Sequence, residues 1–211
     1  MLKTPEIRIG VVVLVLLFGF GAANATTVAI ESFADPVVWS NADNQDWSLG
    51  YEFSVTGSAT VYALGYNYFD TPLNSSHTVG IYDSSGNLLA SAVVTNASTD
   101  YDGYLYTSLS SPLVLGSGDY YIVGTTLGLD DGWLYQADDI VTAPGISFIE
   151  SYYASGNGGT LGFPSTDASD RQYLDVNFAT STTPVPEPTS IVLLGTGLAG
   201  AVLAAWRRRK A

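Results

Sequence analysis

Short runs of β-branched and aromatic residues, separated by turn-forming residues, fill most of the chain between residues 26 and 180. Val, Ile, Tyr, Phe and Thr favour strands, whereas Gly, Pro, Asn, Asp and Ser favour the turns between them. No stretch of this span keeps the 3.6-residue spacing of an amphipathic helix. Many short strands without helices bury their apolar faces by packing one sheet on another. The sequence therefore predicts an all-β fold, an antiparallel β-sandwich that is jelly-roll-like.

The expected strands lie close together along this body. They cover residues 27–33, 50–55, 60–69, 77–83, 87–94, 103–109, 112–115, 119–127, 132–136, 146–154 and 171–178. Ser84, Ser85 and Gly86 predict a tight hairpin turn, because glycine readily adopts positive φ. Residues 116–118, Gly-Ser-Gly, predict another turn.

The N-terminus has the three parts of a secretory signal peptide. Lys3 and Arg8 are its cations, an apolar run follows from Ile9 to about Phe20, and the triplet Ala-Asn-Ala ends at Ala25. This order predicts a signal peptide over residues 1–25 that signal peptidase removes after Ala25. An uncleaved membrane anchor is the alternative, which the shortness of the apolar run disfavours.

The C-terminus has the composition of a membrane anchor. Residues 189–206 carry no charge, and as a helix they would span about 27 Å, close to the ~30 Å hydrocarbon core of a bilayer. A basic cluster follows, formed by Arg207, Arg208, Arg209 and Lys210. Such clusters stay in the cytoplasm, so residues 207–211 are expected inside and the body outside. The body of residues 26–180 is expected to form one β-sandwich domain, joined to this helix by a linker at 181–188.

A four-residue motif, Val185, Pro186, Glu187 and Pro188, precedes this anchor. The motif, the apolar segment and the basic end together resemble the PEP-CTERM sorting signal of Gram-negative bacteria. The resemblance implies that an exosortase, a membrane protease-transpeptidase, reads the motif. It also implies an exported protein of an organism that makes extracellular polysaccharide and biofilm. The precursor would be held in the inner membrane, and the mature form would lie in the cell envelope or the extracellular matrix.

Two segments of the body also resemble an uncharacterised family of bacterial extracellular β-sandwich modules, found beside carbohydrate-active and surface proteins. The residues that carry this resemblance are Asp83, Gly86, Leu88, Leu89 and Ala90, then Pro112, Leu115, Gly118, Tyr120 and Tyr121. They are turn and core positions, so the resemblance supports the fold and implies no activity.

The charge of the body restricts its partners and chemistry. Between residues 26 and 180 there are eighteen Asp and Glu and one cation, Arg171, which gives a formal charge of −17. Such a body repels nucleic acid and anionic lipid headgroups. The chain has no cysteine, which excludes disulfides and thiolate chemistry. His77 is the only histidine, so we expect it to be structural, and we expect no catalytic residue and no resident cofactor.

The acids leave two alternatives open. Calcium takes six to eight oxygen ligands, so loop aspartates are candidate ligands, although none of these loops follows the EF-hand pattern. The candidates are Asp100, Asp102, Asp130, Asp131, Asp138, Asp139, Asp167 and Asp170. Solvated turn aspartates are the simpler interpretation. A pair of carboxylates could also serve a glycan hydrolase.

Aromatic residues are the other candidate site. All fourteen tyrosines lie in the body, together with Trp39, Trp47 and Trp133. Aromatic faces stack on sugars, so we single out Trp133, Tyr152 and Tyr153 as candidate glycan contacts; core and cross-strand packing is the alternative role. The sequence as a whole predicts an exported, non-enzymatic envelope or matrix protein with an adhesive or polysaccharide-binding role. The alternative is a secreted hydrolase with a carboxylate pair.

Overall fold

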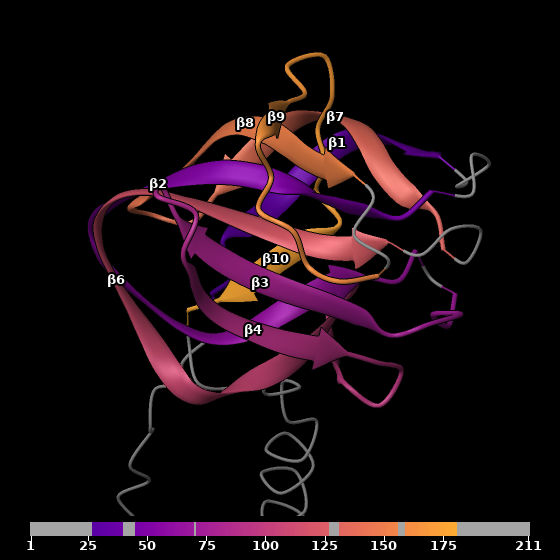
Figure 1. The fold of residues 1–211 in the computed structure, drawn as a ribbon, viewed down its shortest axis with the longest axis horizontal. Coiled ribbons are helices and arrows are strands. Elements are labelled where there is room, and N and C mark those ends of the chain that lie inside the picture. Colours follow the sequence, from indigo (N-terminus) through magenta and orange to yellow (C-terminus); the bar gives the residue numbers. More distant parts are fainter. Residues whose placement is uncertain (1–26, 40–44, 70, 127–130, 156–158, 181–211) are drawn as a thin grey trace, which may run out of the picture.

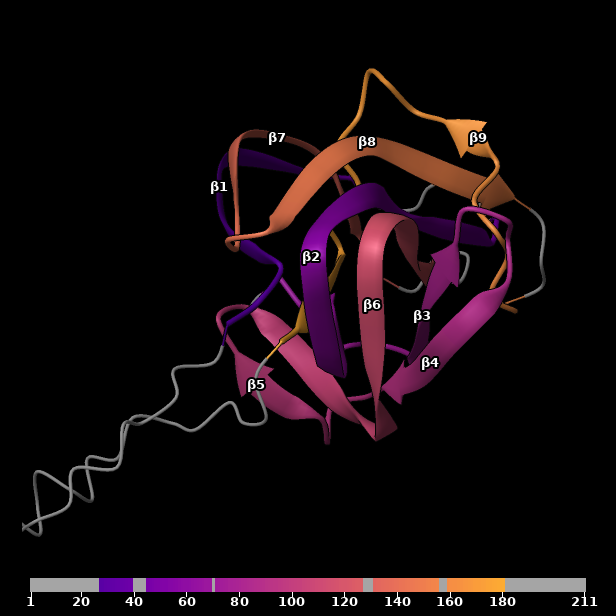
Figure 2. The same cartoon turned by 90° about the vertical axis from the view of Figure 1, so that its left-hand side faces the viewer.

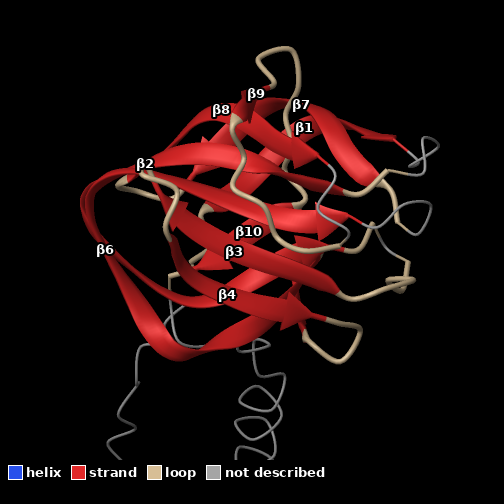
Figure 3. Cartoon of the chain, in the orientation of Figure 1, coloured by secondary structure: helices blue, strands red, loops and turns tan. Residues whose placement is uncertain are grey.

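The described part of the protein is built from β-strands. A computed structural model describes residues 27–39, 45–69, 71–126, 131–155 and 159–180. The strands are β1 (Ile30–Trp39), β2 (Trp47–Asn67), β3 (His77–Asp83), β4 (Leu88–Val94), β5 (Thr99–Tyr101), β6 (Tyr104–Thr126), β7 (Trp133–Thr142), β8 (Ile146–Ser155), β9 (Thr166–Asp167) and β10 (Val176–Ala179). Within these residues there are strands and loops but no helix, as Figure 3 shows. The prediction of an all-β fold is confirmed.

Every strand pairing is antiparallel. The larger sheet has the order β4-β3-β6-β2-β8-β9, with β10 added along β2 and β5 along β6. The strands β1 and β7 form a separate two-stranded sheet. Antiparallel sheets are thus confirmed, whereas the jelly-roll connections stay a prediction.

Two long strands bend the larger sheet back over itself (Figure 2). The first half of β2 pairs with β8 and with the second half of β6, and its second half pairs with β10 and the first half of β6. The core lies inside this curve. Its largest fully buried side chains include Tyr51, Tyr66, Phe53 and Phe178.

The bend corrects the prediction of separate strands at 50–55 and 60–69 and of a turn at 116–118. Residues 50–55 and 60–67 belong to one strand, β2, and residues 116–118 lie inside β6; both strands continue through the bend, and β2 ends at Asn67, before the predicted end at 69. A register shift between Val55 and Ser58 inserts a bulge, and Gly57 and Gly118 take φ values of 83° and 151°. The hydroxyl of Ser117 accepts from the Gly57 N–H at 2.9 Å and donates to the Gly57 carbonyl at 3.1 Å. These flexible residues therefore bend two paired strands together and do not end them.

Both ends of the described body meet beside this bend. Thr180 N–H donates to the Thr27 carbonyl at 2.8 Å, and Val28 forms a bridge with Ala179. Thr27 and Thr180 share a hollow with Ser58 and Pro144. The opposite end of the body holds Trp47 at the start of β2, eight residues before Val55 and hence roughly 25 Å along the strand.

The predicted terminal segments lie outside the described residues. They are the signal peptide with its cleavage at Ala25, the linker at 181–188, the apolar helix at 189–206 and the basic tail at 207–211. In the part of the chain that the structure describes, no helix has the length and apolarity to cross a membrane.

Candidate functional site

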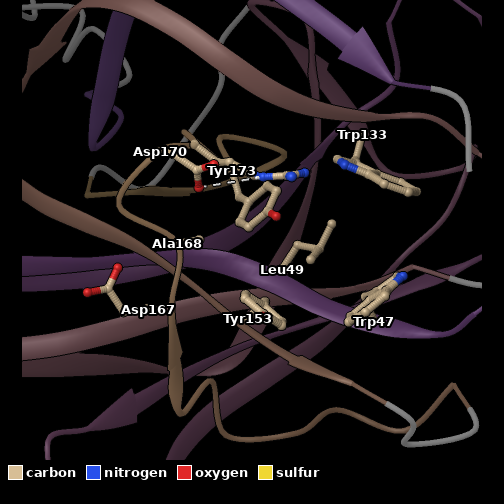
Figure 4. A pocket seen from close by; sticks show the side chains of 9 residues that line it. Trp47, Leu49, Trp133, Tyr153, Asp167, Ala168, Asp170 and Tyr173 are labelled. Carbon is tan, nitrogen blue, oxygen red and sulfur yellow. Dashed lines mark ion pairs between the residues drawn. The ribbon is translucent and has the colours of Figure 1, made fainter.

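A pocket of about 370 Å³ opens at the end of the body away from the bend. We call it the aromatic pocket (Figure 4). Its aromatic and basic lining comes from Trp47, Trp133, Tyr153, Arg171 and Tyr173. Leu49, Ala168, Asp167 and Asp170 complete the lining. Four separate segments of the chain contribute, so only the folded structure assembles this pocket.

The regular strands place the aromatic rings of the pocket. Trp47 begins β2 and Trp133 begins β7, while Tyr153 on β8 pairs with Leu49 of β2. Trp47 and Tyr153 meet edge to face, with ring centroids 5.6 Å apart. Such contacts fix ring orientation, since the edge of one ring faces the negative face of the other.

Backbone hydrogen bonds hold the segment of residues 167–173 against β8. The Tyr173 N–H donates to the Ser151 hydroxyl at 2.8 Å, and the Ala168 N–H donates to the Ser151 carbonyl at 2.9 Å. The Gln172 N–H reaches the Tyr135 carbonyl on β7 at 3.0 Å. This segment thus ties β8 to β7 and forms one wall of the pocket. It also corrects the predicted strand at 171–178, because β10 begins only at Val176.

Two indole N–H donors belong to the lining of the pocket. The Nε1 atoms of Trp47 and Trp133 are buried, and neither has a hydrogen-bond partner among the described residues. Trp133 is only 7% exposed. Figure 4 shows the Trp133 nitrogen on the side of its ring that faces Tyr173. Since a buried donor without an acceptor is costly, an incoming acceptor would be favoured here.

The charged side chains of the pocket lie at its mouth. Arg171 Nε is 3.7 Å from Asp170 Oδ1, and the Arg171 guanidinium lies 5.6 Å from the centre of the Tyr135 ring. Asp170 and Asp167 are exposed. With two carboxylates and one guanidinium, the mouth carries a formal charge of −1.

The structure separates the three predicted glycan contacts. Trp133 and Tyr153 line the aromatic pocket, whereas Tyr152 lies on the other face of β8, edge to face with Tyr121 at 5.1 Å. Neighbouring residues of a strand point to opposite faces, which explains the separation. The sequence interpretation did not select Trp47, Arg171 or Tyr173. For Arg171 the signal was present, because it is the single cation of the body.

A carboxylate pair lies on the Tyr152 face. Glu52 and Glu150 are directly opposed on β2 and β8, both half-buried. Burial, followed by the charge of Glu52, raises the pKa of Tyr121 and of Tyr152 above the ordinary value. Opposed like charges are unfavourable on neighbouring strands. This pair is the closest counterpart to the carboxylates that the hydrolase alternative requires.

The candidate calcium ligands are dispersed. Asp100 accepts from the Tyr68 hydroxyl at 3.2 Å, Asp131 pairs with His77, and Asp138 and Asp139 are exposed on β7. Asp130 lies outside the described residues. Among the residues that are described, no three His, Cys, Asp or Glu side chains gather as metal ligands. Calcium binding stays a prediction.

His77 lies in the interior and is fully buried. Its ring stacks on Tyr66 with centroids 3.8 Å apart, its Nδ1 lies 2.6 Å from the Thr125 carbonyl, and its Nε2 lies 3.0 Å from Asp131 Oδ2. Burial works to raise the pKa of Asp131, but hydrogen bonds from His77 and from the backbone of Asn74 bring it below the ordinary value. These contacts favour a structural role for His77. The ring holds Asp131, which lies two residues before Trp133.

A second aspartate, Asp175, fixes the start of β7. Its side chain is buried, and its Oδ1 accepts from the Leu134 N–H at 2.6 Å. Its Oδ2 has no hydrogen-bond partner among the described residues. Burial raises the pKa of Asp175 to about 8. Trp133, next to Leu134, is thus held by two aspartates.

The residues of the sorting signal are outside the described part of the chain. They are Val185, Pro186, Glu187 and Pro188, with the basic cluster Arg207, Arg208, Arg209 and Lys210. The comparison with known families identifies a PEP-CTERM protein-sorting motif at residues 184–210. The chain is therefore an exported precursor that an exosortase sorts at the cell envelope.

No curated protein matches the chain. The family described as a domain of unknown function, DUF4082, matches residues 34–175, which include the two bent strands β2 and β6 and every residue that lines the aromatic pocket. Because this match covers more than half of the sequence, the chain belongs to the DUF4082 family.

Proposed function

We propose that the body is a non-enzymatic glycan-binding module, which the PEP-CTERM signal delivers to the envelope or the extracellular matrix. The observation that carries this proposal is the aromatic pocket. Tyrosine and tryptophan rings there lie beside buried N–H donors and exposed carboxylates. Rings that pack on C–H faces, with a few polar groups for hydroxyls, suit a sugar.

The position of the pocket supports the proposal. The pocket lies at the end of the body opposite Thr27 and Thr180, and the sorting motif begins at residue 184. A body held through its C-terminal side would therefore present the pocket away from the membrane. An adhesive protein needs this orientation to reach a polymer in the matrix.

The decisive measurement is retention of the full-length protein, in detergent, on gels that contain matrix polysaccharides. We expect Trp47→Ala to weaken retention about tenfold or more, because this ring is a half-buried wall of the pocket. Tyr152→Ala is the matched control, since it removes an aromatic ring from the other face of β8. A wild-type protein that no polysaccharide retains would end the proposal.

A hydrolase is the second candidate, favoured by the opposed Glu52 and Glu150. We rank it second because these carboxylates lie on the face of β8 away from the aromatic pocket. Reproducible turnover of a glycan panel by the wild type, lost in Glu150→Gln, would reverse this order.

The sorting half of the proposal has its own test. We expect Glu187→Ala to leave the precursor unprocessed and membrane-held, because the motif loses its one charge. The molecular mass of the mature protein on a gel measures this, with Glu31→Ala as the control. Normal maturation of the Glu187 variant would contradict the assigned role of the motif.

A further inference from the structure

The aromatic pocket has a donor excess that restricts the chemistry of its ligand. The indole N–H groups of Trp47 and Trp133 are buried, and no described residue accepts from either. An indole N–H can only donate, so a ligand must bring acceptor oxygens to satisfy it. A ligand rich in donors would leave both indoles unsatisfied.

The charge of the protein excludes anionic acceptors. At the mouth of the pocket, Asp170 lies beside Arg171 and offsets its charge, and Asp167 adds a further negative charge. The whole body carries eighteen acids and one cation. A carboxylate, sulfate or phosphate group would meet this field when it approached, so the acceptor oxygens belong to a neutral group.

The apolar lining distinguishes a carbonyl from a hydroxyl. Leu49 and Ala168 are buried beneath the aromatic rings, with 3% and 5% of their surfaces exposed. An acetamido group combines a carbonyl acceptor with a methyl group that suits such a surface. A hydroxyl offers no methyl group and brings a donor that requires an acceptor of its own.

We propose that the aromatic pocket binds the acetamido group of a neutral N-acetylhexosamine polymer, with the carbonyl accepting from Trp133 and the methyl packing on Leu49 and Ala168. The N–H of Trp47 takes a second oxygen of the same sugar. The exposed Asp167 accepts from the amide N–H or a hydroxyl at the mouth. This inference rests on the proposed glycan-binding function and adds the sugar class to it.

The test is calorimetric titration of the full-length protein, in detergent, with four tetrasaccharides. They are β-1,4-linked tetramers of N-acetylglucosamine, glucose and glucosamine, and a tetramer of a uronic acid. We expect the acetylated tetramer to bind about tenfold or more tightly than the glucose tetramer, since the hydroxyl of the latter brings no methyl group for Leu49 and Ala168 and adds a donor that needs an acceptor of its own. The uronic acid tetramer should bind most weakly.

Two variants that keep an aromatic ring but remove an indole N–H show which donor gives the preference for the acetylated tetramer. Trp133→Phe keeps an aromatic ring and removes the N–H, so the preference for the acetylated tetramer should fall to less than threefold. Trp47→Phe should weaken the acetylated and glucose tetramers to a similar extent, and it remains informative if Trp133→Phe fails to fold. Tyr152→Phe should change neither affinity.

The outcomes separate this inference from the proposed function. Equal affinity for the acetylated and glucose tetramers, or tighter binding of the glucosamine or uronic acid tetramer, overturns the acetamido assignment and leaves glycan binding intact. Binding of none of the four overturns the assignment, and the retention experiment then decides the proposed function separately. An acetyl preference that survives in Trp133→Phe also overturns the assignment.

Discussion

Asp131 and Asp175 are both anchors near the start of β7, yet their environments differ. Asp131 in the preceding loop has His77 and the backbone N–H groups of Asn74 and Ser75 as partners, and its pKa lies below the ordinary value. Asp175 has the Leu134 N–H as its side-chain partner, and burial raises its pKa to about 8. The number of donors around a buried carboxylate thus decides whether it is held charged or neutral.

The comparison matters for the pocket because Trp133 lies between the two anchors. Asp131 precedes it by two residues, and Leu134, the partner of Asp175, follows it. The His77 ring lies within hydrogen-bond distance of both the Thr125 carbonyl and Asp131 Oδ2, so Asp131 has a ring partner that Asp175 lacks. The anchor at Asp131 therefore has several hydrogen-bond partners, whereas the anchor at Asp175 is held neutral by burial.

The largest effect should come from removing the His77 ring. We expect His77→Leu to lower the free energy of unfolding by about 3–5 kcal/mol, because the Thr125 carbonyl and Asp131, which is nearly buried, both lose their ring partner. Urea unfolding measures this. Asp138→Asn, on the exposed side of β7, is the control and should stay within about 0.5 kcal/mol of the wild type. A His77 variant that loses less than about 1 kcal/mol would show that the contact between His77 and Asp131 is not an anchor.

The neutral anchor at Asp175 should weaken as pH rises from mildly acidic to about 8. The pKa of Asp175 is raised, so the folded state keeps a proton that the unfolded state has released, and stability falls as pH rises from about 4 to about 8. Asp175→Asn is neutral at every pH and should gain on the order of 2 kcal/mol over the wild type at pH 8. Unfolding curves at pH 5, 6, 7 and 8 test this. Parallel stability profiles for variant and wild type would contradict the assigned protonation.

The smallest effect should appear in acid. The pKa of Asp131 is lowered, so its contribution to stability is complete above the unfolded pKa of about 4 and disappears as pH falls through the folded pKa. Asp131→Asn should therefore show a shallower loss of stability below pH 4, by on the order of 1 kcal/mol. The same unfolding curves at pH 2 to 5 provide the measurement. If the unfolding free energy of the variant falls below pH 4 as steeply as that of the wild type, Asp131 does not contribute to the loss of stability in acid.

Local sequence signals predicted the simple strands of the fold correctly. The expected strand at 77–83 coincides with β3, and the turn before β4 has Gly86 at a φ of 84°. The glycines of residues 116–118 were misread as a turn, because the same residues bend a strand when a partner strand bends beside them. Alternation alone could not reveal this pairing, which links residues about 60 positions apart.

The aromatic pocket was less predictable. Trp133 and Tyr153 were selected as candidate glycan contacts, and they meet in one pocket. Tyr152 was selected with them, although the alternation of side chains along a strand separates it from its neighbour. Trp47, Arg171 and Tyr173 reach the pocket from distant segments, and only the antiparallel register of β2 and β8 and the hydrogen bonds to Ser151 bring them together.

The two ends of the described body, Thr27 and Thr180, meet beside the bend of β2 and β6. This position has a mechanical consequence. A polymer gripped at Trp47 and a tether leaving at Thr180 would pull on opposite poles of the body. The force would pass from β10 into β2 and would act along the direction of these strands. The hydrogen bonds between β2 and its neighbouring strands lie across this direction, so they would be loaded in shear and would share the force. A ladder loaded in this way shares the force among many hydrogen bonds, whereas a ladder pulled open from one end breaks its bonds one at a time.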